Sequence, residues 1–143
     1  MFNPTRDQAR LFLFDVWAKY RGAQPLSALE AMALDIVLLH PEYHAVLDDR
    51  ERYLDRDWQP EGGETNPFLH LSMHLAIDEQ LSIDQPPGMR SAVERLARRL
   101  DSAHEARHAV MDCLAEVIWQ AQRNGAAFDN AAYLDCLERK AAP

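Results

Sequence analysis

The sequence predicts an all-α protein, a single-domain helical bundle of five to seven helices over residues 1–143. Apolar residues recur at helical spacing along nearly the whole chain, and no segment has the alternation of a convincing strand. Glycine is scarce, with five residues in 143. Residue pairs typical of helix starts precede most of the apolar stretches. A chain of this length, 48% hydrophobic, can bury a core as one domain.

Two helices are expected in the first forty residues. Asn3 followed by Pro4 predicts an N-cap and a first helical position, and the helix that they open extends to near Gly22. Ser27 and Glu30 have the spacing of a capping box, which predicts the start of a second helix.

The second helix should end at His40, because the residue before a proline avoids the α region and Pro41 follows. A short turn or a new helix comes next. The charged segment 48–65 has no clear period and contains a double glycine near its end. It is expected to be a solvated loop whose three larger apolar side chains pack against the core: Tyr53, Leu54 and Trp58.

The second half of the chain begins with Asn66 and Pro67, again an N-cap and a first helical position. The helix that follows is apolar almost all round, which is typical of a central helix. The segment QPPG at 85–88 ends it. Three further helices are expected: Arg90 to Leu100, a long helix from the capping pair Ser102 and Glu105 to about Asn124, and a short one from Asp129 to about Arg139.

The net charge of -8 argues against nucleic acid and against an anionic membrane surface, since both need a basic footprint. No apolar run approaches the roughly 18 residues of a membrane span. The first ten residues lack the apolar core of an export signal. The two cysteines, Cys113 and Cys136, are expected to be small buried hydrophobic residues in a reducing compartment. These features together predict a cytoplasmic protein.

All six histidines fall in His-x-x-x-His pairs, which is the most informative pattern in the chain. The pairs are His40 and His44, His70 and His74, and His104 and His108. Residues four apart share one face of a helix, and imidazole is a common ligand of transition metals. The pattern therefore predicts a metal site. An aspartate follows each pair by four residues: Asp48, Asp78 and Asp112. These three carboxylates are expected to be solvated charges rather than ligands, because most carboxylates are exposed.

The middle pair, His70 and His74, is expected to lie inside, because it shares a side of the most apolar helix. The third pair would meet it across a helix–helix contact, and the first pair would complete the set. The ion would be a divalent transition metal, with zinc or iron first.

Several stretches resemble one known family over nearly the whole chain: NPFLHLSMHLAIDEQLSIDQPPG at 66–88, HEARHAVMDCLAEVIWQAQ at 104–122, HPEYH at 40–44 and the opening MFNPTRDQAR. They are similar to the domain of unknown function 1841 family, a group of small bacterial proteins. The resemblance implies a bacterial cytoplasmic domain and brings no activity with it.

The leading hypothesis is a metal-binding helical bundle that uses histidine pairs from different helices. It would be a metalloenzyme or a sensor if the ion keeps an open position, and structural if it does not. The alternative is a metal-free cytoplasmic interaction module with structural histidines, in which the acidic 48–65 loop binds a protein partner. Histidines that titrate near neutral pH could also form a pH sensor. Homo-oligomerisation is left open.

Overall fold

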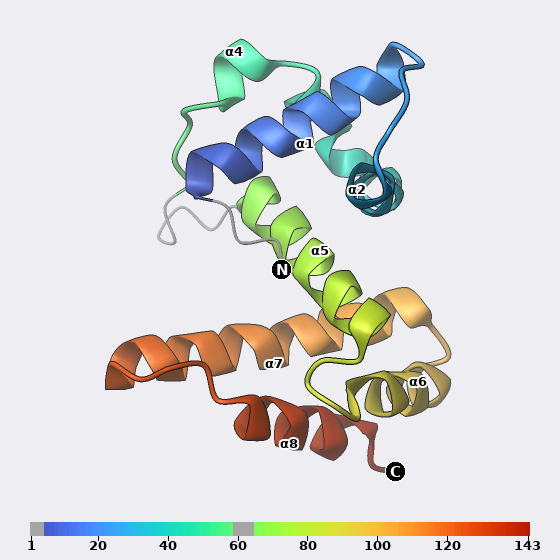
Figure 1. Ribbon diagram of the computed structural model, residues 1–143, viewed down its shortest axis with the longest axis vertical. Helices are drawn as coiled ribbons and strands as arrows, with labels where there is room; N and C mark the ends of the chain where they lie inside the picture. The colour runs from blue at the N-terminus through green and yellow to red at the C-terminus, as the bar shows by residue number, and fades with distance from the viewer. Residues whose placement is uncertain (1–4, 59–64) are drawn as a thin grey trace. The chain divides into compact units, whose positions relative to one another are not determined.

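The computed structural model describes residues 5–58 and 65–143 (Figure 1). This part of the chain contains eight α-helices, one 3-10 turn and no strand, so the all-α prediction is confirmed. The helix count exceeds the expected five to seven because two of the helices, α3 (His44–Leu47) and α4 (Arg50–Tyr53), are single turns of four residues.

The chain divides into two compact units, Met1–Ala76 and Ile77–Pro143. Helix α5 (Pro67–Ile83) contributes its first ten residues to unit 1 and its remaining residues to unit 2. The single domain over residues 1–143 stays a prediction.

Unit 1 begins with two longer helices, α1 (Arg6–Arg21) and α2 (Ala28–Leu38). Thr5 caps α1, and the predicted cap at Asn3 and Pro4 lies outside the described residues. The capping box of Ser27 and Glu30 at the start of α2 is confirmed. After His40 comes the 3-10 turn η1 (Pro41–Tyr43), so the helix does end before the proline.

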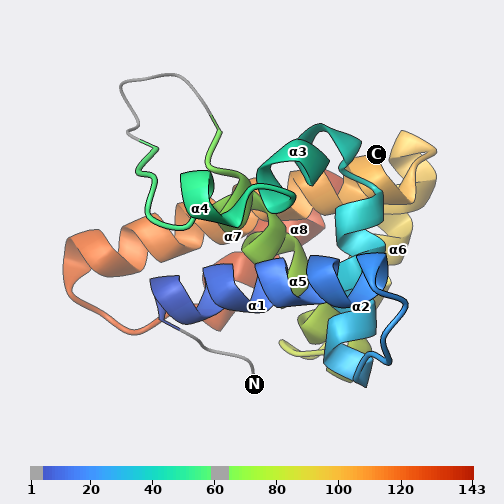
Figure 2. The same cartoon turned by 90° about the horizontal axis from the view of Figure 1, so that it is seen from above.

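The core of unit 1 forms where α1, α2, α3 and α5 present their apolar faces to one another. Figure 2 shows α2 beside the C-terminal half of α1, with α3 following it along the chain. The core residues are Leu13, Phe14, Val16, Trp17, Ala33, Ile36, Val37, Leu47, Phe68, Leu71 and Leu75. Tyr53, Leu54 and Trp58 pack against this core, as predicted. The 48–65 segment is not all loop, however, because Arg50–Tyr53 form α4, and its residues 59–64 lie outside the described residues.

Unit 2 consists of the end of α5 with α6 (Met89–Leu100), α7 (Ala103–Asn124) and α8 (Asn130–Ala141). Helices α6, α7 and α8 contact one another pairwise. Ser102 and Asp129 cap α7 and α8 with their side chains, as predicted. Gly125 ends α7 at a φ of 61°, a left-handed conformation that glycine adopts without strain.

The prediction for the cysteines is wrong in one respect. Cys113 on α7 and Cys136 on α8 are not separate thiols, because they form a disulfide bond that links the two helices. Cys113 is indeed buried, but Cys136 is partly exposed. The pairing depends on how α7 packs against α8, which spacing along the chain does not reveal.

Among the helices that the described residues form, none has both the length and the apolar character of a membrane span.

The charge on Glu30 makes the stability of unit 1 depend on pH. Hydrogen bonds from Lys19 Nζ (2.7 Å) and from the Ser27 N–H (2.8 Å) lower the pKa of the Glu30 carboxyl. A lowered pKa adds stability above the ordinary glutamate range, and this stability is lost as the pH falls through the lowered pKa. Glu30→Gln keeps the capping box, in which glutamine also serves, but it does not titrate.

We therefore expect the free energy of unfolding of Glu30→Gln to fall less than that of the wild type when the pH drops from about 6 to about 3. Urea titrations at both pH values measure the two differences. Equal differences in the two proteins would show that Glu30 does not carry this pH dependence.

Candidate metal centre

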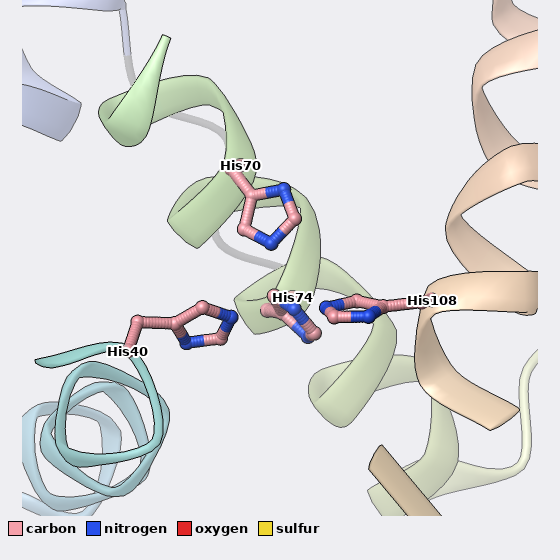
Figure 3. Close-up of side chains that lie close together, drawn as sticks. All are labelled: His40, His70, His74 and His108. Carbon is pink, nitrogen blue, oxygen red and sulfur yellow. The ribbon is translucent and has the colours of Figure 1, made fainter. Parts of the chain in front are cut away.

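Three imidazole rings converge within unit 1 (Figure 3). The ring centroids lie 5.0 Å apart for His40 and His70, 4.7 Å for His40 and His74, and 4.9 Å for His70 and His74. Each ring offers one nitrogen to a group in which all the ligating nitrogens lie within 4.8 Å of one another. His40 and His74 are buried, and His70 is partly buried.

Two of these rings are brought together by helix geometry alone. His70 and His74 stand four residues apart on α5, so they project from the same face about one turn apart. Asn66 fixes the start of that helix, because its side-chain oxygen accepts hydrogen bonds from the N–H groups of Phe68 and Leu69. The predicted pair is therefore present as a pair.

His40 reaches the group by a different route. It stands where α2 has ended, with φ -127° and ψ 64°, immediately before Pro41. The proline thus places His40 at a corner of the chain, and the ring points from there toward α5 (Figure 3). The sequence predicted that the helix ends before Pro41, but not that the His40 side chain would point toward α5.

A backbone carbonyl selects the tautomer of the neutral His40 ring. His40 Nδ1 lies 2.7 Å from the Ile36 oxygen, and because a carbonyl oxygen can only accept, Nδ1 carries the hydrogen. The lone pair then belongs to Nε2, the nitrogen that points toward His74 in Figure 3. A histidine that donates one ring N–H to a carbonyl and offers the other nitrogen is typical of metal ligands.

Tyr43 is the residue of this site that the sequence analysis missed. Its ring is stacked on His40, with centroids 5.7 Å apart and planes 5° apart, and it meets His70 edge-on at 5.9 Å. Burial raises the pKa of the Tyr43 hydroxyl, which keeps it neutral. Tyr43 follows His40 by three residues across η1, and side chains three apart eclipse in a 3-10 turn. That spacing was the available signal.

His44 does not belong to this group among the described residues. Its Nε2 donates to the Val37 oxygen at 2.8 Å, and its ring lies over Trp17 with centroids 4.4 Å apart. Asp48 accepts a hydrogen bond from the Trp17 indole at 2.7 Å. His44 and Asp48 therefore hold the turn after α2 against α1.

The third pair lies in unit 2. The rings of His104 and His108 are 4.3 Å apart on α7, as their spacing predicts. Beside them, Arg107 Nε binds Asp78 Oδ1 at 2.8 Å, so Asp78 is an ion-pair partner there. Asp112 is exposed.

The three rings of unit 1 have the chemistry of a transition-metal site. The group contains imidazoles and no carboxylate among the residues that the structure describes, and imidazole suits zinc, copper, iron and nickel. A tetrahedral zinc ion with Zn–N bonds of about 2.0–2.1 Å holds its nitrogens about 3.3 Å apart. The nitrogens here lie up to 4.8 Å apart, so side-chain rotations would have to bring them closer to reach this spacing.

No curated protein and no solved structure matches this chain. A family model does: the domain of unknown function DUF1841 matches residues 5–139, nearly the whole sequence. The resemblance seen in the histidine-bearing segments is thereby confirmed, and the chain belongs to the DUF1841 family.

Proposed function

We propose that this protein binds a divalent transition-metal ion through His40, His70 and His74, with zinc as the first candidate and iron as the second. The convergence of these three rings carries the proposal. Zinc comes first because it is bound well by imidazole alone, whereas the common mononuclear iron sites with two histidines also use a carboxylate. The hydrogen bond to the Ile36 carbonyl supports His40 as a ligand, since it selects the tautomer in which Nε2 can bind an ion.

The sequence-based proposal of further ligands from the third pair also has support. Arg107, the residue before His108, is held by Asp78, which follows His74 by one turn of α5. We propose His108 as the fourth ligand on this ground. We keep His104 as a further candidate ligand, because its ring lies beside that of His108 on α7.

A catalytic or sensing role follows if the ion keeps one position open. Catalytic zinc sites commonly have three protein ligands and a water, whose pKa the metal lowers toward neutrality. In that case the bound water would be the reactive group, and Tyr43, whose ring is stacked on His40 and whose hydroxyl is kept neutral by burial, would border the site. With four protein ligands, the site would be structural.

Metal analysis of the untagged full-length protein tests the proposal. Titration calorimetry with zinc should give one high-affinity site in the wild type and none of comparable affinity in His74→Ala, because the loss of one imidazole leaves the ligand set incomplete. The matched control is His44→Gln, a histidine of the same sequence pattern that lies outside the group.

Equal loss of binding in both variants would contradict the assignment of the ligands. A wild type that binds no zinc, copper, nickel or iron would contradict the function, and it would favour the metal-free interaction module instead.

A further inference from the structure

We propose that the Cys113–Cys136 disulfide is a thiol-exchange site, in which Cys136 is the sulfur attacked and a zwitterionic low-molecular-weight thiol of the cysteine or glutathione class is the attacking molecule. The proposal concerns unit 2 and does not depend on the metal centre.

The two sulfurs of this bond differ in access. Cys113 lies on the buried face of α7 and is 0% exposed. Cys136 on α8 is partly exposed and lines two adjoining cavities. An attacking thiolate must approach the sulfur directly, so the folded protein offers Cys136 alone.

The larger cavity lies between the C-terminal half of α7 and α8, which Figure 1 shows in orange and red. Its volume is about 520 Å³, within the range of small-molecule sites. Four of its lining residues have small side chains that leave the cavity open: Ala121, Ala126, Ala127 and Ala132. The second cavity, of about 470 Å³, continues from Cys136 toward Lys140.

Charges of both signs surround Cys136 in these cavities. Arg139 and Glu116 line both of them, Asp129 lines the larger, and Lys140 and Asp112 line the smaller. Arg139 Nε pairs with Asp135 at 3.2 Å in an exposed ion pair. The other N–H groups of its guanidinium would attract a carboxylate of the incoming thiol, and Glu116 would attract its ammonium group. A thiol with both charges is thus favoured over a neutral thiol of the same reactivity.

The exchange is balanced in atoms and electrons. The thiolate sulfur bonds to Cys136 Sγ, the Sγ–Sγ bond breaks, and its electron pair goes to Cys113 Sγ, which takes up a proton as a buried thiol. The attacking thiol is oxidised to a mixed disulfide and Cys113 is reduced. A second thiolate then bonds to the attached thiol sulfur and releases Cys136 as a thiol.

The test begins with the full-length oxidised protein and reduced glutathione. Free thiols are alkylated after reaction, and peptide mass spectrometry locates the mixed disulfide. We expect the adduct on Cys136, with Cys113 alkylated only after denaturation. An adduct on Cys113, equal adducts on both, or exchange only in denatured protein would overturn the proposal.

A matched pair of variants that both lack the disulfide compares the access of the two sulfurs directly. Cys113→Ser and Cys136→Ser both lack the disulfide, and circular dichroism checks that each is folded. With glutathione disulfide, Cys113→Ser should form a mixed disulfide in the folded state, whereas Cys136→Ser should not. Equal labelling of the two folded variants would overturn the inferred difference in access.

The choice of thiol is tested by rate ratios. The rate with glutathione divided by the rate with neutral β-mercaptoethanol should fall about two- to fivefold in Arg139→Gln, the effect of one exposed charge. It should stay unchanged in Arg98→Gln, an exposed arginine on α6 that lines neither cavity. An unchanged ratio in Arg139→Gln would overturn recognition of a zwitterion.

Discussion

Zinc at a thousandfold excess over its dissociation constant is expected to raise the free energy of unfolding of unit 1 by about 4 kcal/mol, and His74→Ala should remove this gain. An ion that binds only the folded state stabilises it by mass action. His40, His70 and His74, the three proposed ligands within unit 1, come from two places in it, the end of α2 and helix α5. Unfolding separates them, so the unfolded chain holds no comparable site.

Tryptophan fluorescence can report this unfolding in unit 1 alone. Trp17 and Trp58 lie in unit 1, and Trp119 on α7 is the third tryptophan of the chain. Trp119 is 49% exposed, so Trp119→Phe is a mild change that silences the signal of unit 2. Urea titrations in this background, with zinc and with chelator, give the stabilisation.

The control in the same background is His44→Gln, which should keep the zinc-dependent gain although it loses the hydrogen bond to Val37. A gain that persists in His74→Ala would contradict the ligand assignment. A wild type whose midpoint is the same in zinc and in chelator would contradict binding.

The predictions that held were those set by residues close together in sequence. A capping box, a proline after a helix and two histidines four apart act within one or two turns, so the spacing alone contains the geometry. The box at Ser27 and the histidine pair on α5 were therefore predictable.

The three copies of the His-x-x-x-His-x-x-x-Asp pattern show where spacing stops being informative. In the first copy Pro41 breaks the helix, so His40 turns toward α5 while His44 packs on Trp17. Asp48 and Asp78 occupy the same place in their copies, yet one binds an indole and the other an arginine. Each outcome depends on which helix packs alongside, and that is a tertiary property.

The disulfide was missed for the same reason. Cys113 and Cys136 are 23 residues apart on different helices. Their bond requires α7 and α8 to pack in the one register that brings the two Cα atoms to 5.9 Å. Neither helix specifies that register by itself, and low cysteine content favoured two separate thiols.

Arg10→Met is expected to lower the free energy of unfolding of unit 1 by about 3 kcal/mol, since it leaves several backbone carbonyls without a charged donor. Arg10 is 2% exposed. Its Nη1 donates to the Leu54 oxygen at 2.9 Å and to the Arg56 oxygen at 2.7 Å. The guanidinium also lies over the rings of Trp58 and Phe68, 5.3 and 4.9 Å from their centroids.

Burial lowers the pKa of the Arg10 guanidinium, but arginine stays protonated at any physiological pH, so its charge persists inside the unit. The expected loss therefore comes from the hydrogen bonds that tie the segment after α4 to α1. Methionine fills a similar volume, which limits the contribution of a cavity.

The matched control for Arg10→Met is Arg6→Gln on the same helix. Arg6 pairs with Asp57 at 2.6 Å, but both side chains are more than half exposed, and such a surface pair contributes at most about 1 kcal/mol. Urea unfolding of both variants, followed by tryptophan fluorescence with Trp119 replaced by phenylalanine, compares the two losses. Arg10→Met could lower the free energy of unfolding no more than Arg6→Gln does. In that case the packing of α1 holds the segment after α4 without the guanidinium, and water satisfies the carbonyls that Arg10 binds in the wild type.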